Sequence, residues 1–435
     1  MPMYYKLVTA LKVHTRYIFN LGATFMSQAI SALSVLILTP VLLHSLGTED
    51  FAVYGILLNA IVFSTVFDFG LNMGLLKKVI ENRTGQNELI NTVFFFFSGF
   101  LLFSIPLFYV LYLLGIIAIH GNAWMFTLLA AVLICQNVLI LFFDVLIQTA
   151  NKIFLARIIR VGKLLLELVL LFILSTYHSV VVLLLASIVI NLIYLGVLFY
   201  FSKKEVHYQL SFKYFSLPLL WQHFQYSCWY FFNSIAMALV FNTQVIMLNR
   251  FGDANSIAKY LLVTRFFDII RIGIANFMAV LFPTLISIQA SGNWVLIKRN
   301  FLLSLQRSGL LSFFAIGIVV ILVKPYFLIW SKFNDAEIAH LFVAYGVFVF
   351  LIAIDNISAT FLGALKFNKA PTIVSIVQGL LALILLYFLL PTMGVMGAVV
   401  SSIIALALTN LLFNPLYLLR MIHGKIAVNL QSDPS

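Results

Sequence analysis

The sequence predicts an all-α protein that crosses a membrane about twelve times, with both termini in the cytoplasm. Three observations predict this fold: the composition, the lengths of the apolar runs and the distribution of basic residues. The 435 residues are 63% hydrophobic and 9% charged, and their mean hydropathy is +1.10. Soluble domains carry about 25% charged residues, so most of this chain is expected to lie in a bilayer.

Twelve apolar runs meet or approach the length of a spanning helix, which is about 20 residues. Short polar turns separate them, and the turn at 175–179 divides the fifth run from the sixth. The runs cover residues 18–43, 51–76, 90–119, 124–150, 158–176, 179–201, 217–249, 257–287, 301–323, 338–365, 371–390 and 394–420. The predicted parts are a basic segment at 1–17, a six-helix bundle at 18–201, a linker at 202–216, a second bundle at 217–420 and a tail at 421–435.

The basic residues predict how these spans are oriented. With a cytoplasmic N terminus, 20 of the 26 Lys and Arg residues fall in segments on the cytoplasmic side and three fall in loops on the other side. The remaining three lie inside one span. This bias follows the positive-inside rule, and it explains the net charge of +12 without a nucleic-acid partner. Residues 1–17 lead into a full-length apolar run, so a cytoplasmic segment is expected there and not a cleaved signal.

Two runs that stand six spans apart share local sequence. The second run opens after a turn with Gly47 and carries Asp68 near its end. The eighth run opens after a turn with Gly252 and carries Asp268 at a similar place. Matching positions at a six-span offset predict two halves of the same orientation, related by an axis along the membrane normal.

Four charged residues lie within the eighth run: Lys259, Arg265, Asp268 and Arg271. A charge at mid-bilayer costs about 2.5–3.5 kcal/mol on insertion scales, so such residues persist where they face one another or a water-filled interior. Arg265 and Arg271 each stand three residues from Asp268, which predicts three head groups on one side of the helix. One carboxylate between two guanidiniums leaves a surplus positive charge, which an anionic ligand would need. Lys259 lies near the outer surface, where snorkelling alone would explain it.

One acid is embedded in each of four runs of the same orientation: Asp68, Asp144, Asp268 and Asp355. Two interpretations of Asp68, Asp144 and Asp355 stay open. They line a gate or take up a coupling proton, or else they pair with basic residues at the inner helix ends and hold helices together. His223 in the seventh run is a further coupling candidate, because an unperturbed histidine titrates near neutrality.

The sequence offers little that enzymatic chemistry would use. It contains no P-loop, nucleophile elbow, zinc-protease motif or Cys-x-x-Cys pair. Cys135 and Cys228 both lie inside apolar runs and are expected to be packing residues without a metal or redox role. Lys163 and Glu167 stand four residues apart near an inner helix end, which favours a structural ion pair.

Several motifs together carry a resemblance to a known family. They are the turn with Leu46, Gly47, Phe51 and Tyr54, the step Asp68-Phe69-Gly70-Leu71, and the exit LGALKFNKAP at 362–371. Residues 38–79 resemble the first helical hairpin of the polysaccharide transport family. These are the Wzx-type O-antigen flippases of the multidrug/oligosaccharidyl-lipid/polysaccharide exporter superfamily. Twelve spans also fit, so the resemblance covers the whole chain, although Ala52 stands where many relatives have Gly.

The resemblance implies a flippase of the bacterial inner membrane, with about twelve transmembrane helices in two six-helix bundles around a central cavity. It would move undecaprenyl-diphosphate-linked oligosaccharide repeat units of O-antigen, or of a similar surface polysaccharide, to the periplasmic leaflet by alternating access. Arg265 and Arg271 would hold the diphosphate, and Asp268 would limit their grip. A polysaccharide polymerase and a chain-length regulator are the partners implied beside the lipid bilayer. No cofactor is expected, and the energy would come from a gradient, with H⁺ or Na⁺ as the coupling ion.

Two rival functions stay open. A cation-coupled multidrug exporter of the same superfamily would want a net acidic cavity, and the surplus arginine in the eighth run argues against it. A membrane-embedded glycan polymerase or glycosyltransferase would need large outside loops, and the longest one here runs roughly from Lys324 to Glu337.

Overall fold

The computed structural model describes residues 2–62, 64–81, 86–113, 123–150, 152–290, 292–330, 336–365, 367 and 369–432. Side chains are described over most of these ranges, with residues 2–18, 107–113, 275–284 and 322–330 as the main exceptions. The described residues form fifteen α-helices and two short 3₁₀ helices and include no β-strand, which confirms the all-α prediction. Contacts divide the chain into unit 1, Met1–Phe231, and unit 2, Phe232–Ser435.

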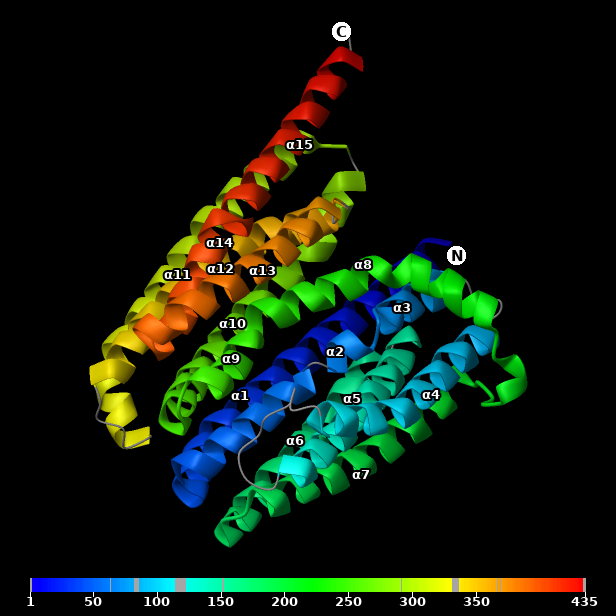
Figure 1. Cartoon of the computed structure of the whole chain (residues 1–435). Helices are drawn as coiled ribbons and strands as arrows, with labels where there is room; N and C mark the ends of the chain where they lie inside the picture. Colours follow the sequence, from blue (N-terminus) through cyan, green and yellow to red (C-terminus); the bar gives the residue numbers. More distant parts are fainter. Residues whose placement is uncertain are drawn as a thin grey trace. The chain divides into compact units, whose positions relative to one another are not determined.

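Unit 1 contains α1 to α7 and the first part of α8, coloured from blue to green in Figure 1. Helix α1 turns at Gly47, whose φ of 76° and ψ of 177° lie outside the helical region. The sequence predicts the loop between the first two spans at this place. The elements are α1 (Pro2–Val62), α2 (Ser64–Phe67), α3 (Leu71–Glu81), α4 (Gln86–Leu113), α5 (Ala123–Thr149), α6 (Ile153–Leu174), η1 (Ser175–Tyr177), α7 (Val180–Val206), η2 (Phe212–Tyr214) and α8 (Leu217–Phe241).

The core of unit 1 forms around α5, which packs against α3, α4 and α7. Phe142 of α5 is fully buried, and its ring meets the rings of Phe97 and Phe143 edge to face. Lipid tails are as apolar as these side chains, so apolar burial by itself gives membrane helices little reason to associate. Interlocking shapes and van der Waals contacts therefore hold this bundle together.

Helix α3 and the first part of α8 approach closely because two glycines face α8. Gly70 and Gly74 stand four residues apart, which is the spacing that lets membrane helices pack at short range. A Cβ at Gly70 would lie 2.6 Å from the backbone nitrogen of Phe231, and a Cβ at Gly74 would meet Ser227 and His223. Gly70 also has a φ of +70°, where an L side chain is strained.

Two asparagines of α4 fasten the segment that connects α7 to α8. Asn91 Nδ2 donates to the carbonyl of Gln209 at 2.8 Å, and Asn91 Oδ1 accepts from the amide of Ser211 at 2.8 Å. Asn87 Oδ1 accepts from the amide of Gln209 at 3.0 Å. A carboxamide offers a donor and an acceptor, as a peptide group does, so these side chains fix the path of the connecting backbone along α4.

Unit 2 contains the rest of α8 and the helices α9 to α15, coloured from green to red in Figure 1. Helices α8 and α9 meet at Asn242 with a bend of 41°. Beside this bend, Gln244 Nε2 donates to Ser402 Oγ of α14 at 2.9 Å. The elements are α9 (Thr243–Phe251), α10 (Ala254–Ala290), α11 (Trp294–Trp330), α12 (Ala336–Ala364), α13 (Lys369–Met393), α14 (Val395–Leu408) and α15 (Asn410–Ser432).

Each of the twelve predicted apolar runs overlaps a described helix. Six described helices are long and apolar enough to cross a membrane, or seven if α8 and α9 form one bent span. The number twelve, the cytoplasmic termini and the predicted part boundaries therefore stay predictions. The division between the two units falls inside α8, between Phe231 and Phe232.

Replacement of Gly70 by alanine tests the close approach of α3 and α8. Gly70→Ala is expected to lower the stability of the protein by about 1–3 kcal/mol, because the new methyl group overpacks a backbone contact. Gly162→Ala on α6 is the matched control, because a Cβ there meets nothing within 4 Å. Melting temperatures of both purified variants in detergent are the measurement, and equal values would refute the close contact.

Thiol labelling tests the predicted orientation of the seventh run. After replacement of Cys135 and Cys228 by serine, single cysteines are placed at Lys204 and at Arg250, which flank this run. A membrane-impermeant maleimide is expected to label the cysteine at position 250 in intact spheroplasts. It is expected to label the cysteine at position 204 only after lysis, since the two positions are predicted to lie on opposite sides of the membrane. The cysteine-free protein is the control. Labelling of both cysteines from the same side would contradict the predicted orientation.

Candidate functional site

Helix α10 carries the charged residues that the sequence places inside a span. The helix begins after Asp253, whose Oδ1 accepts a hydrogen bond from the amide of Ser256 at 3.0 Å and caps the first turn. Hydrogen bonding from Ser256 also lowers the pKa of Asp253. The cap fixes where α10 starts, and this sets which side of the helix each later charge occupies.

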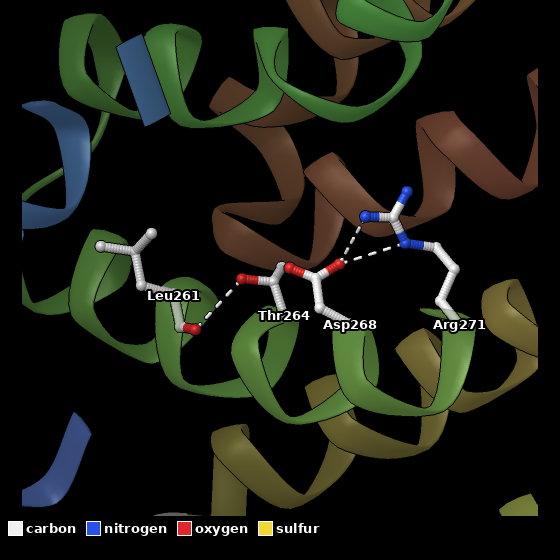
Figure 2. Close-up of polar contacts among 4 residues, drawn as sticks. All are labelled: Leu261, Thr264, Asp268 and Arg271. Atoms are coloured by element: carbon white, nitrogen blue, oxygen red, sulfur yellow. Dashed lines mark hydrogen bonds and ion pairs between the residues drawn. The ribbon is translucent and has the colours of Figure 1, made fainter. Parts of the chain in front are cut away.

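Arg271 and Asp268 form an ion pair on one side of α10. The Asp268 Oδ1 atom accepts from Arg271 Nη2 at 2.8 Å and from Arg271 Nε at 3.1 Å. Figure 2 shows the guanidinium leaning back over the helix to the carboxylate. This follows the general rule that helical side chains point toward the N-terminal end of the helix. The Arg271 side chain is 25% exposed and the Asp268 side chain is 34% exposed, so both charged groups are accessible from outside the protein.

An aromatic ring of α8 lies against the same guanidinium. The Cζ atom of Arg271 stands 4.2 Å from the ring centroid of Phe241. A cation over a ring face gains about 0.5–2 kcal/mol, and more where water is excluded. The ring and Asp268 together hold the guanidinium in place, while Arg271 Nη1 makes no hydrogen bond to a described residue. This nitrogen can donate to an anionic ligand.

Arg265 differs from the predicted arrangement. Within the described residues it forms no ion pair with Asp268, so the carboxylate neutralises one guanidinium and not two. Helical side chains generally point toward the N-terminal end of their helix, a direction that favours the approach of Arg271 to Asp268 over that of Arg265. The predicted surplus of one positive charge is retained, because Arg265 has no carboxylate partner among the residues that the structure describes.

Lys259 is buried within the protein and has an ion-pair partner on another helix. The residue is only 4% exposed, and its Nζ lies 2.5 Å from Glu337 Oε2 at the start of α12. Sequence reasoning did not identify Glu337, since a partner 78 residues away leaves no local pattern. Lys259 therefore joins α10 to α12 through its ion pair with Glu337. It is not part of the ion pair between Arg271 and Asp268.

Aromatic rings of α10 also pack against aromatic rings of α12. Phe267 and Phe342 have centroids 4.7 Å apart, and Tyr260 and Tyr345 have centroids 6.1 Å apart. Offset and edge-to-face ring pairs add about 0.5–1.5 kcal/mol each beyond simple burial. These ring contacts hold the part of α10 that carries Asp268 against α12 within unit 2.

The other embedded acids each have their own polar neighbours. Asp144 Oδ2 lies 3.7 Å from Arg157 Nη1 and accepts from Gln148 Nε2 at 2.7 Å. Asp355 Oδ1 accepts from Asn414 Nδ2 of α15 at 2.7 Å. The structure thus gives both acids contacts that hold helices together. Their assignment as gate or coupling residues stays a prediction.

Asp68 and His223 lie beside the break between α2 and α3. Asp68 Oδ1 accepts from the amide of Gly70 at 2.5 Å. His223 is fully buried, and its Nε2 lies 3.1 Å from the carbonyl of Leu71. Both residues belong to unit 1. Among the described residues, no group of three His, Cys, Asp or Glu side chains is placed to hold a metal ion.

Three solved structures share the fold of this chain. An inward-facing multidrug resistance MATE family transporter of the MOP superfamily is 13% identical with a TM-score of 0.72, over 91% of this chain and 95% of that chain. The lipid II flippase MurJ in an inward closed conformation is 15% identical with a TM-score of 0.71, over 96% and 93%. A MOP superfamily transporter from Pyrococcus furiosus is 12% identical with a TM-score of 0.65, over 94% and 96%.

These likenesses show the fold, which is that of the MATE and MurJ transporters. No curated protein matches the chain. The sequence model of one family, described as polysaccharide biosynthesis protein, matches residues 19–289. The match includes the whole segment from Lys259 to Arg271 and more than half of the 435 residues. The chain therefore belongs to the polysaccharide biosynthesis protein family.

Proposed function

We propose that this protein is a flippase for undecaprenyl-diphosphate-linked oligosaccharide repeat units in the bacterial cytoplasmic membrane. It would carry the repeat unit of O-antigen, or of a similar surface polysaccharide, from the cytoplasmic to the periplasmic leaflet. The family match supports a role in polysaccharide biosynthesis, and the fold is one that transporters use. A polymerase that uses the translocated unit, and a chain-length regulator, are the partners that we propose for this function.

The observation that carries the proposal is the position of Arg271. Its guanidinium is restrained by Asp268 and Phe241 but keeps Nη1 available. A guanidinium matches the geometry of phosphate oxygens and can bind them through two parallel hydrogen bonds. Arg265 supplies a second positive charge on the same helix. The local charge of these three residues is positive by one unit, which suits a diphosphate.

The proposed mechanism assigns each group a separate task. Arg271 and Arg265 bind the diphosphate, and the glycan follows it through a polar path while the prenyl chain stays in the lipid. Asp268 competes with the diphosphate for the Arg271 guanidinium, which weakens the grip and permits release. Alternating access moves the head group across, and an ion gradient of H⁺ or Na⁺ supplies the energy.

The rival functions fit the charges less well. A site for cationic drugs would require surplus negative charge, and Asp268 is outnumbered by Arg265 and Arg271. A polymerase or glycosyltransferase would need large outside loops, and the longest predicted one here runs only roughly from Lys324 to Glu337. The flippase therefore remains the proposal that the charges support best.

Complementation of a flippase-null strain tests the role of Arg271. Wild-type protein is expected to restore surface polysaccharide, Arg271→Ala to abolish rescue, and Arg271→Lys to restore it in part, because lysine keeps the charge and loses the bidentate geometry. Surface polysaccharide and accumulated lipid-linked repeat units are measured together at matched expression.

Arg250→Ala is the matched control for this experiment. Arg250 is an exposed arginine in the last turn of α9, and it lies outside the proposed site. Full rescue by Arg271→Ala would move the anion site elsewhere. Loss of rescue by Arg250→Ala would show that removal of an arginine is harmful in itself.

Asp268→Asn tests whether the carboxylate limits the hold on the diphosphate. The variant is expected to bind undecaprenyl diphosphate about ten-fold more tightly, a difference of about 1.4 kcal/mol, because Arg271 loses its neutralising partner. The same variant is expected to restore less surface polysaccharide, since the ligand leaves slowly. Fluorescence titration of the purified protein measures the affinity. Weaker binding together with full rescue would refute this role.

A further inference from the structure

Buried polar side chains surround the break between α2 and α3 in unit 1. Ser64 belongs to α2, Asp68 follows the end of that helix, and Asn72 lies in the first turn of α3. Their exposed fractions are 0%, 8% and 2%. A bilayer core supplies no water to such groups, so every polar atom here needs a partner from the protein or from a ligand.

The backbone at this break leaves helical geometry. Phe69 has a φ of 51° and Gly70 a φ of 70°, and α3 begins at Leu71. From α5, Asn137 Nδ2 donates to Ser64 Oγ at 2.7 Å, which brings another carboxamide to the same place. Secondary transporters coordinate Na⁺ where a spanning helix is interrupted and oxygen atoms gather.

Asn72 and Asp68 lack some of the partners that buried polar side chains normally have. The carboxamide of Asn72 lies beside the Asp68 carboxylate, but its Oδ1 and Nδ2 make no hydrogen bond of normal geometry with a described residue. Native proteins rarely leave buried polar atoms without partners. Asp68 also has no Lys, Arg or His ion-pair partner among the described residues. A buried carboxylate without a counter-charge is strongly disfavoured.

We propose that Asp68, Asn72, Ser64 and Asn137 form a binding site for one Na⁺ ion. Asp68 supplies the charged ligand, and the carboxamide and hydroxyl oxygens supply neutral ligands, which are the atoms that hard cations prefer. One carboxylate balances one monovalent charge. A divalent ion would leave a net positive charge in the apolar core, where an uncompensated charge is costly, so Na⁺ suits the site better than Mg²⁺ or Ca²⁺.

The role of this ion rests on the proposed function, in which Na⁺ would be the coupling ion. A bound ion links the end of α2 to α3 and α5, and its release frees these segments to move against one another. Binding of the ion, however, requires no lipid-linked sugar. A failure of the site can therefore be distinguished from a failure of the flippase proposal.

Direct binding of ²²Na⁺ to the purified full-length protein in detergent tests the site. The wild type is expected to bind one ion per chain, which excess unlabelled NaCl displaces and choline chloride does not. Asp68→Asn is expected to weaken binding by at least about ten-fold, because it removes the charged ligand. Asn72→Ala is expected to weaken it less, because a neutral ligand is lost.

Glu167→Gln is the matched control. Its carboxylate also lies in unit 1 but pairs with Lys163 at 2.6 Å, so this variant is expected to bind ²²Na⁺ as the wild type does. Size-exclusion profiles establish that each variant is folded, and Asn72→Ala carries the test if Asp68→Asn does not fold. Equal binding by the wild type and the folded Asp68 or Asn72 variants would overturn the proposal. So would the absence of Na⁺-specific binding to the wild type, as expected if Asp68 exchanged protons alone.

Discussion

The apolar interior of a bilayer is the constraint on which this structure depends, because it offers no hydrogen-bonding partner to a backbone or side-chain group. Helices satisfy the backbone along most of the described chain. At two interruptions a side chain bonds to the backbone: Asp68 accepts from the amide of Gly70, and Gln244 of α9 donates to the carbonyl of Val240 beside the bend at Asn242. At both of these interruptions, the polar side chain that bonds to the backbone comes from the same unit.

The same constraint shapes the charged groups of α10. Arg271 forms an ion pair with Asp268 and a cation–π contact with the ring of Phe241, and Lys259 forms an ion pair with Glu337. These two arrangements have different consequences. The lysine is nearly enclosed and serves to join two helices, whereas the arginine is held at one edge and can still donate to a ligand. The difference lies in the surroundings, since both side chains project from one helix.

Local pattern in the sequence predicted the helices and the pairing of Asp268 with Arg271, because hydropathy and three-residue spacing act along one helix. The i,i+4 pair of Lys163 and Glu167 was also predicted and is confirmed, with its atoms 2.6 Å apart. Partners on other helices were missed. Glu337 and Phe241 approach α10 only through tertiary packing, so no spacing in the sequence points to them. Residue spacing alone allowed Asp268 two arginine partners, and the described residues show it paired with Arg271.

The asparagines that fasten the connection between α7 and α8 have a mechanical consequence. Asn87 and Asn91 of α4 hold the backbone of Gln209 and Ser211, so this stretch of the connection is anchored to α4. The path of the chain into α8 is therefore set within unit 1, because side chains of α4 hold the backbone that leads to the first turn of α8.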